Sequence, residues 1–225
     1  MKAAALPTPQ KDRIMEGLIA TWYTRNRGRD WSWFRTIARQ VAERVPPGAS
    51  VLDVATGPGS LAIEIARTGR RVYALDLSRS FVQIAREEAA RAGVEVDVRH
   101  GSASAMPFPD ACFDLVICTA AFKNFASPLG ALNEMHRVLK PGGEASVHDL
   151  RNDATREDID AEVRSMPMSS LNRAITSLIF RYGLIKTAYS QAQLEGMAAE
   201  SRFGGCEIAR QGVGFEVRLR KHAGD

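Results

Sequence analysis

Two glycines and two aspartates between residues 53 and 76 have the types and spacing of a nucleotide-binding site. Gly57 and Gly59 belong to a turn, where the absence of a Cβ lets the backbone approach a ligand closely. A helix expected to begin just after Gly59 would point its N–H groups into the same space. Asp76 follows Gly57 by 19 residues, and a carboxylate at that place can accept hydrogen bonds from both hydroxyls of a ribose.

Dinucleotides and S-adenosylmethionine are the two ligand classes that use this geometry. From Gly57 the sequence reads G-P-G-S-L-A and ends at Ala62, where the dinucleotide fingerprint prefers a third glycine. Asp53 lies four residues before Gly57, inside the expected strand. A pyrophosphate gains nothing from a carboxylate there, whereas the ammonium group of a methionine does. The spacing therefore favours S-adenosylmethionine over NAD.

The elements that must position these residues alternate regularly between residues 48 and 150. Short apolar runs predict parallel strands at 51–55, 71–75, 94–99, 114–118 and 144–148. The segments between them predict helices at 61–68, from Ser78 or Ser80 to Gly93, and at 126–139. Strands that alternate with helices predict an α/β fold, with a parallel sheet and right-handed crossovers.

The remaining segments lack this alternation. Residues 11–45 predict two helices, the second with an apolar stripe that includes Phe34 and Val41. Residues 152–203 are mostly helical in pattern, and two short strand candidates flank Gly212. We expect a single domain of four parts: a helical N-terminal cap (1–47), a cofactor-binding core (48–151), a helical lid or acceptor segment (152–203) and a terminal β-hairpin (204–225).

The overall composition is that of an ordinary globular protein, with 45% hydrophobic and 25% charged residues among 225. The 30 basic and 26 acidic side chains are scattered, which argues against a nucleic-acid partner. No apolar run approaches the ~18–20 residues of a membrane span, and the first ten residues have no signal-peptide core. Three cysteines without CxxC spacing argue against a disulfide scaffold or a zinc ribbon. We therefore expect a cytoplasmic protein without a metal site.

Four segments, in order, resemble the class I S-adenosylmethionine-dependent methyltransferases across about residues 48–150. They are residues 51–59, 72–78, 106–114 and 137–143. Phe122-Lys123-Asn124-Phe125 is similar to the branch that contains the ubiquinone/menaquinone C-methyltransferases and related small-molecule enzymes. The resemblance implies a Rossmann-like sheet of seven strands, parallel except for an antiparallel final hairpin.

The resemblance also implies which residues bind the cofactor. The loop 55–59 would hold the methionine part, Asp76 the ribose and residues 101–103 the adenine. The complete expected set is Tyr23, Asp53, Ala55, Gly57, Gly59, Asp76, Leu77, Ser102, Ala103, Met106 and Thr119. Two residues depart from the family pattern. Ala55 stands where glycine is usual, and Ser102 stands where an acidic residue commonly faces the adenine amine.

Methyl transfer is an in-line displacement with a neutral leaving group, so a base is needed only if the acceptor must lose a proton. His148, at the carboxyl end of the fifth expected strand, is the candidate base, or else a hydrogen-bonded structural histidine. Asn124 is the candidate that orients the acceptor, or else a helix cap. Met166, Met168, Phe180 and Tyr189 are either acceptor-pocket or core residues.

The leading hypothesis is a methyltransferase, monomeric or homodimeric, that acts on a small, fairly apolar organic acceptor. The second is a methyltransferase that acts on RNA or protein, motivated by Arg25, Arg27, Arg29, Trp31 and Trp33. The third is a protein that retains the cofactor fold but no longer methylates.

Overall fold

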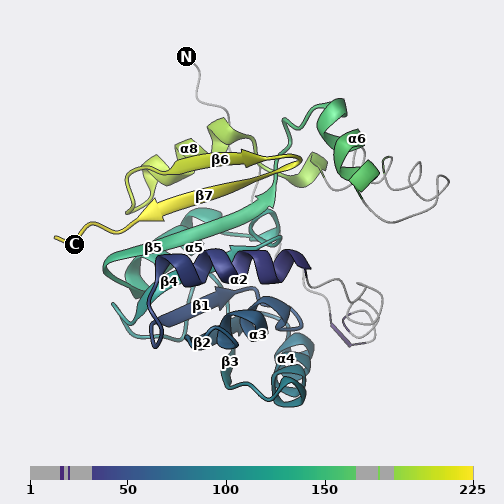
Figure 1. Ribbon diagram of the computed structural model, residues 1–225. Coiled ribbons are helices and arrows are strands. Elements are labelled where there is room, and N and C mark those ends of the chain that lie inside the picture. The colour runs from purple at the N-terminus through teal and green to yellow at the C-terminus, as the bar shows by residue number, and fades with distance from the viewer. Residues whose placement is uncertain (1–15, 18–19, 21–31, 166–176, 178–184, 225) are drawn as a thin grey trace.

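The computed structural model describes residues 16–17, 20, 32–165, 177 and 185–224 (Figure 1). Seven strands form one sheet in the order β3-β2-β1-β4-β5-β7-β6. Strands β1 to β5 pair parallel with one another, and β7 pairs antiparallel with both β5 and β6. The predicted parallel sheet with an antiparallel final hairpin is therefore confirmed. The strands are β1 (Ser50–Val54), β2 (Arg71–Asp76), β3 (Val96–His100), β4 (Phe113–Thr119), β5 (Leu139–Leu150), β6 (Glu207–Gln211) and β7 (Gly214–Arg220).

Helices cover both faces of the sheet. Alternate residues of the central strands point to opposite faces, so Val51 and Leu115 pack with one helical layer and Leu52 and Val116 with the other. The first layer contains α2 (Ser32–Arg44), α3 (Ser60–Ala66) and α4 (Arg79–Ala92), and the second contains α5 (Pro128–Val138) and α8 (Gln191–Glu200) (Figure 1). All five residues of β1 are buried, as the near-continuous apolar run predicted.

The expected helix boundaries are confirmed where a capping residue defines them. The Ser78 hydroxyl accepts a hydrogen bond from the Phe81 N–H, and Gly93 ends α4 in the left-handed conformation. Helix α2 buries Phe34 and Val41, as its stripe predicted. The first predicted helix, from residue 11, lies largely outside the described residues.

Strand β5 is longer than the predicted 144–148. Leu139 already pairs with Phe113, and the register then shifts so that Glu144 pairs with Leu115. Pro141-Gly142-Gly143 lie between the predicted helix and the predicted strand, but in the structure they form an irregularity within the strand, with Gly142 at φ 78°. The strand also extends to Leu150, two residues beyond His148, which pairs with the last residue of β4, Thr119.

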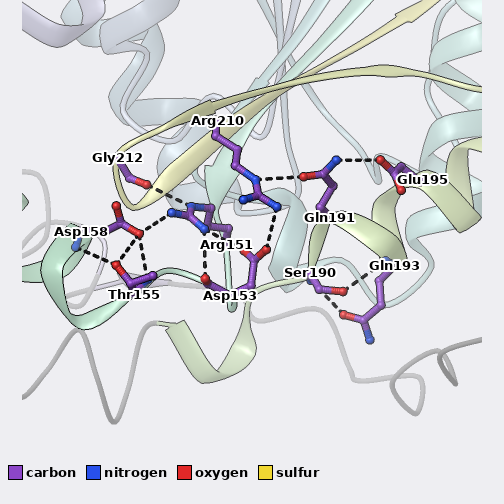
Figure 2. A network of polar contacts seen from close by, with 10 residues as sticks. All are labelled: Arg151, Asp153, Thr155, Asp158, Ser190, Gln191, Gln193, Glu195, Arg210 and Gly212. Atoms are coloured by element: carbon purple, nitrogen blue, oxygen red, sulfur yellow. Dashed lines mark hydrogen bonds and ion pairs between the residues drawn. The ribbon is translucent and has the colours of Figure 1, made fainter.

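A polar network joins the segment after β5 to the terminal hairpin (Figure 2). The buried Arg151 guanidinium donates to the Gly212 carbonyl (3.0 Å) and forms ion pairs with Asp153 (3.2 Å) and Asp158 (2.5 Å). Asp158 belongs to α6 (Arg156–Ser165). Arg210 of β6 donates to Gln191 of α8 at 2.9 Å (Figure 2). The hairpin is therefore linked to α8 directly and to α6 through Arg151.

No helix in the described part of the chain is long and apolar enough to cross a membrane.

Candidate functional site

The carboxyl ends of β1, β2 and β4 surround a cavity with about 1040 Å³ of space, part of it open to solvent. This is the edge at which open α/β sheets bind ligands. Its lining comes from the loops after these strands, from the loop after β3 and from the first turns of α2, α3 and α4. The lining residues are Phe34, Val54, Ala55, Thr56, Gly57, Pro58, Leu61, Leu75, Asp76, Leu77, Ser78, Phe81, Gly101, Ser102, Ala103, Ser104, Thr119, Ala120, Ala121, Asn124, Phe125 and Ser127.

Asp76 ends β2 and joins the two loops that line the polar end of the cavity. One carboxylate oxygen accepts a hydrogen bond from the Gly57 N–H at 2.8 Å, and the other accepts from the Ser78 N–H at 2.8 Å. Burial raises the pKa of this carboxyl, while the backbone donors partly oppose that rise. Asp76 therefore has the position that the sequence predicted for a ribose-binding carboxylate.

Asp53 lies directly below the loop that follows β1, and it does not line the cavity. The residue is 1% exposed, and one carboxylate oxygen accepts a hydrogen bond from the Thr56 hydroxyl at 2.7 Å. Thr56 itself lines the cavity. A buried carboxylate one residue layer below the surface can still supply negative charge to a cationic ligand group, because burial lowers the screening by water.

The two glycines of this loop have different functions. Gly57 lines the cavity at φ 56°, and a Cβ there would meet no atom within 4 Å. Gly59, at φ 84°, does not line the cavity, and a Cβ there would lie 3.1 Å from the Ala85 Cβ. The close contact of Gly59 with Ala85 lets α3 approach α4, and its predicted role in cofactor binding stays a prediction.

Ala55 has a left-handed backbone, with φ 58°, and lines the cavity. Left-handed conformations cost an L-residue roughly 1–2 kcal/mol, which explains why glycine suits this position. Ala120, at the end of β4, has φ 54° and lines the same cavity. Both alanines therefore combine backbone strain with a methyl group beside the ligand space.

The predicted adenine-binding residues are divided between the cavity and the core. Ser102 and Ala103 line the cavity, where the Ser102 hydroxyl accepts from the Ser104 N–H at 3.2 Å. Met106 does not line it; its side chain packs in the core, and its N–H donates to Glu134 at 2.7 Å. Leu77 lines the cavity as expected.

Thr119 and Asn124 line the far end of the cavity. Asn124 ends a single 3₁₀ turn, η1 (Phe122–Asn124), which follows β4. The N-terminus of α5 begins at Pro128, and no side-chain cap is formed there by the preceding Ser127. The sequence alternative, that Asn124 caps this helix, has no hydrogen bond to support it among the described contacts.

His148 lies beside the cavity but does not line it. Its ring faces the α2 layer, with Nε2 at 3.0 Å from the Ser146 hydroxyl and 3.8 Å from the Glu216 carboxylate. Burial lowers the pKa of His148 to about 4. Arg44 of α2 forms an ion pair with Glu216 at 2.5 Å, so His148 belongs to a buried polar cluster between β5, β7 and α2. Its catalytic role stays a prediction.

Several residues of the site were not predicted as ligand contacts. Phe34 and Phe81 line the cavity from the first turns of α2 and α4. Phe34 was predicted to lie in the apolar stripe of its helix, and nothing in such a pattern separates a residue that faces a cavity from one that faces the core. Tyr23, Met166, Met168 and Phe180 lie outside the described residues. Tyr189, which was predicted to be either a pocket or a core residue, is buried against Phe122.

Among the described residues, no group of three or more His, Cys, Asp or Glu side chains is arranged to hold a metal ion.

Comparison with known proteins gives the same result as the geometry. Residues 52–147 match the model of the methyltransferase domain family. A demethylmenaquinone methyltransferase of Thermus thermophilus is 38% identical over 122 residues, which are 53% of this chain and 54% of the relative. A ubiquinone/menaquinone biosynthesis C-methyltransferase of Cupriavidus metallidurans is 39% identical over 121 residues, 52% of this chain and 48% of the relative. The chain spans about half the length of these curated relatives.

Solved structures match over more of the chain. A protein from Methanococcus maripaludis has a TM-score of 0.72 at 19% identity, covering 96% of this chain and 98% of its own. An S-adenosylmethionine-dependent methyltransferase from Aquifex aeolicus has a TM-score of 0.61 at 19% identity, covering 86% and 99%. At this identity the likeness shows the fold alone.

The family and the fold imply S-adenosylmethionine as the cofactor, and the residues present fit it. The open Cβ position at Gly57, the Asp76 carboxylate at the end of β2 and the apolar walls from Leu77 and Phe81 all border one cavity. Asp53 is an acidic residue beneath the loop, where it favours the ammonium group of S-adenosylmethionine and offers nothing to the pyrophosphate of a dinucleotide. Residues 52–147 of this chain therefore match the methyltransferase domain family in sequence, and the cavity beside them fits the cofactor that the family implies.

Proposed function

We propose that this chain transfers a methyl group from S-adenosylmethionine to a small, fairly apolar organic acceptor. The observation that carries the proposal is the composition of the cavity. Gly57 and Asp76 form a polar end that suits a ribose, whereas Phe34, Phe81 and Phe125 provide apolar walls. Such a mixture is typical of small-molecule sites, in which a few polar groups fix orientation.

Each end of the cavity has its own function in the transfer. When bound, S-adenosylmethionine supplies a methyl group on a positively charged sulfur, and the sulfide that leaves is neutral. The Asp76 carboxylate would accept hydrogen bonds from the ribose hydroxyls, and Asp53, beneath the loop that follows β1, would supply negative charge for the ammonium group. No residue has to protonate the leaving group, so alignment and exclusion of water supply most of the acceleration.

Asn124 orients the acceptor at the opposite end of the cavity. Its side-chain amide offers two donors and one acceptor atom, which suits a hydroxyl or carbonyl on an otherwise apolar molecule. Phe125 and Ala121 beside it are apolar. His148 is the proposed base if the acceptor must lose a proton, although its ring would have to turn from Ser146 to reach the cavity.

The first acceptor to test is a demethylated quinone in its reduced form. Two relatives named above are methyltransferases of demethylmenaquinone and of ubiquinone/menaquinone biosynthesis, and a reduced quinone ring is planar, apolar and hydroxylated. The family match ends at residue 147, before the segment 152–203 that we propose as the lid or acceptor part.

The test is the transfer of radiolabelled methyl from S-adenosylmethionine to reduced demethylmenaquinone and, in parallel, to a cell extract. The extract is separated into solvent-extractable, RNA and protein fractions. Counts in the solvent-extractable product support the proposal. Counts confined to RNA or protein would replace it with the macromolecular alternative. Of the residues that motivate this alternative, Trp33 is exposed on α2, and the four others lie outside the described residues. No transfer to any fraction would favour a protein that no longer methylates.

A further inference from the structure

A buried ion pair lies directly behind the acceptor end of the cavity, where the proposed reaction assigns it no part. The Lys123 ammonium is 2.6 Å from one oxygen of Asp149, with the two side chains 9% and 2% exposed. Lys123 belongs to η1, and Asp149 is the penultimate residue of β5. Neither side chain lines the cavity. Asn124 and Phe125, the next two residues after Lys123, do.

The pair holds η1 by its backbone as well as by its charge. The second Asp149 oxygen accepts a hydrogen bond from the Lys123 N–H at 3.0 Å, and the first also accepts from the Leu150 N–H at 2.7 Å. The Lys123 ammonium donates to the Ala120 carbonyl at 3.3 Å. One carboxylate therefore connects the end of β5 to both the backbone and the side chain of the turn.

The turn needs such support because its own bonds are few. A 3₁₀ turn of three residues is held by single i to i+3 bonds, here from the Asn124 N–H to Ala121 (2.8 Å) and from the Phe125 N–H to Phe122 (3.1 Å). The preceding Ala120 has a left-handed φ of 54°. This conformation is unfavourable for alanine, so the backbone just before the turn is strained. Without the ion pair, the local sequence gives little reason for Asn124 to face the cavity.

We propose that the Lys123–Asp149 ion pair is a positioning device for the acceptor: it fixes η1 so that Asn124 and Phe125 hold the acceptor in line with the transferred methyl group. This inference rests on the proposed function. Lys123 and Asp149 act through the turn, so they are positioning residues. Asp149 is bound to η1 from the neighbouring strand, which makes the position of Asn124 depend on the sheet and not on the loop alone.

The same strand offers a matched control pair at its opposite end. Lys140 lies 2.8 Å from one oxygen of Asp114, whose other oxygen accepts from the Ser50 N–H at 2.8 Å. This pair also joins β4 to β5, but its side chains are 39% and 30% exposed, and neither lines the cavity. Replacing it should change stability without changing the position of the acceptor.

The first test measures the turn itself and needs no acceptor. The measurement is the hydrogen exchange of the peptide that covers residues 119–127. It is compared among the wild type, Lys123→Met, Asp149→Asn, Lys123→Arg and the control Lys140→Met. Only variants whose circular dichroism spectrum matches that of the wild type are compared. We expect exchange at least tenfold faster in Lys123→Met and Asp149→Asn, and near the wild-type rate in Lys123→Arg and Lys140→Met. Wild-type exchange in both of the first two variants would overturn the positioning of η1.

The second test separates positioning from simple loss of folded protein. With reduced demethylmenaquinone as acceptor, Lys123→Met should raise the acceptor KM and lower kcat, so that kcat/KM falls about tenfold. The affinity for S-adenosylhomocysteine should stay within twofold of the wild type. A variant that is only less folded would lose kcat alone. Faster exchange with unchanged kcat/KM would overturn the effect on the acceptor. If the wild type transfers no methyl to this acceptor, the proposed function fails for it, and the exchange test still decides whether the pair holds η1.

Discussion

The Asp76 carboxylate at the end of β2 accepts a hydrogen bond from the Gly57 N–H, 2.8 Å away, in the loop that follows β1. Two residues that lie 19 positions apart in the sequence thus form one wall of the cavity. A ligand that binds Asp76 through its ribose must therefore lie against the loop that carries Ala55 and Gly57. This contact explains why the spacing of the motif identified the site.

We expect Asp53→Asn to weaken binding selectively, according to whether the ligand has an ammonium group. In the wild type the Thr56 hydroxyl donates to Asp53 at 2.7 Å. The asparagine amide keeps an oxygen that can accept this hydrogen bond but loses the negative charge. Affinity for S-adenosylhomocysteine should fall about tenfold, equivalent to about 1.4 kcal/mol. Affinity for 5′-methylthioadenosine, which lacks the amino-acid part, should change little. Calorimetric titration with both ligands measures the difference, and an equal loss for both would refute the charge argument.

Ala55→Gly should stabilise the fold slightly and give the cofactor more room. Removing left-handed strain gains about 1–2 kcal/mol, while the extra freedom of glycine in the unfolded chain costs about 0.4–1 kcal/mol. The net gain in the free energy of unfolding is therefore about 0–1.6 kcal/mol, and urea denaturation measures it.

Ala111→Gly is the matched control, since Ala111 has φ 52° and does not line the cavity. It should gain similar stability and leave the affinity for S-adenosylhomocysteine unchanged, whereas Ala55→Gly should raise that affinity. Destabilisation by both variants would show that neither alanine is strained.

Stability should fall on acidification because His148 is buried in its neutral form. Its pKa is lowered from 6.5 to about 4, so the folded protein takes up a proton less readily than the unfolded chain. The contribution of neutral, buried His148 to the free energy of unfolding is fully present above pH 6.5 and is lost as the pH falls from 6.5 towards 4. From pH 7 to pH 5 we expect this histidine alone to remove about 2 kcal/mol from the free energy of unfolding.

Urea denaturation at the two pH values measures this loss. His148→Gln should lack most of the loss, and His222→Gln, at an exposed position, should retain it. Equal pH dependence in all three proteins would contradict the assigned burial of His148. Methyl transfer by folded His148→Gln tests its predicted role as a base, which requires transfer to be lost.

Arg151→Met should destabilise the fold more than Arg210→Met. Arg151 is 7% exposed and bonds to Asp153, Asp158 and Gly212, so its loss leaves these acceptors without their donor (Figure 2). We expect a loss of about 2–4 kcal/mol. The Arg210 side chain is 57% exposed, and a pair of that kind contributes about 1 kcal/mol or less. Chemical denaturation of both variants measures the difference, and equal losses would contradict the ranking.

The sheet and its helices could be predicted because short-range patterns determine them. Ser78 and Gly93 mark the ends of α4, and the apolar run of β1 marks a strand covered on both faces. The full length of β5 could not be predicted, because it depends on the pairing of Leu139 with Phe113 across a bulge. Proline and two glycines at 141–143 suggest a turn unless that partner strand is known.

The polar half of the site was equally accessible from the sequence, since Gly57 and Asp76 are required by ligand chemistry at a fixed spacing. The apolar half was not. Phe34 reaches the cavity only because α2 packs against α3 across a long sequence separation. His148 was expected at the site because it ends a strand there, but the parity of β5 turns its ring towards α2 and turns Asp149 towards η1.

The central claim is that this cavity binds S-adenosylmethionine through Asp76. The most direct test is calorimetric titration of S-adenosylhomocysteine into the wild type, Asp76→Ala and Asp97→Ala. Asp97 is an aspartate of the neighbouring strand β3, 42% exposed, that pairs with Arg99 and does not line the cavity. We expect saturable binding at one site in the wild type and Asp97→Ala, and at least tenfold weaker binding in Asp76→Ala. Wild-type protein that does not bind S-adenosylhomocysteine, or folded Asp76→Ala that binds it as tightly as the wild type, would contradict the account.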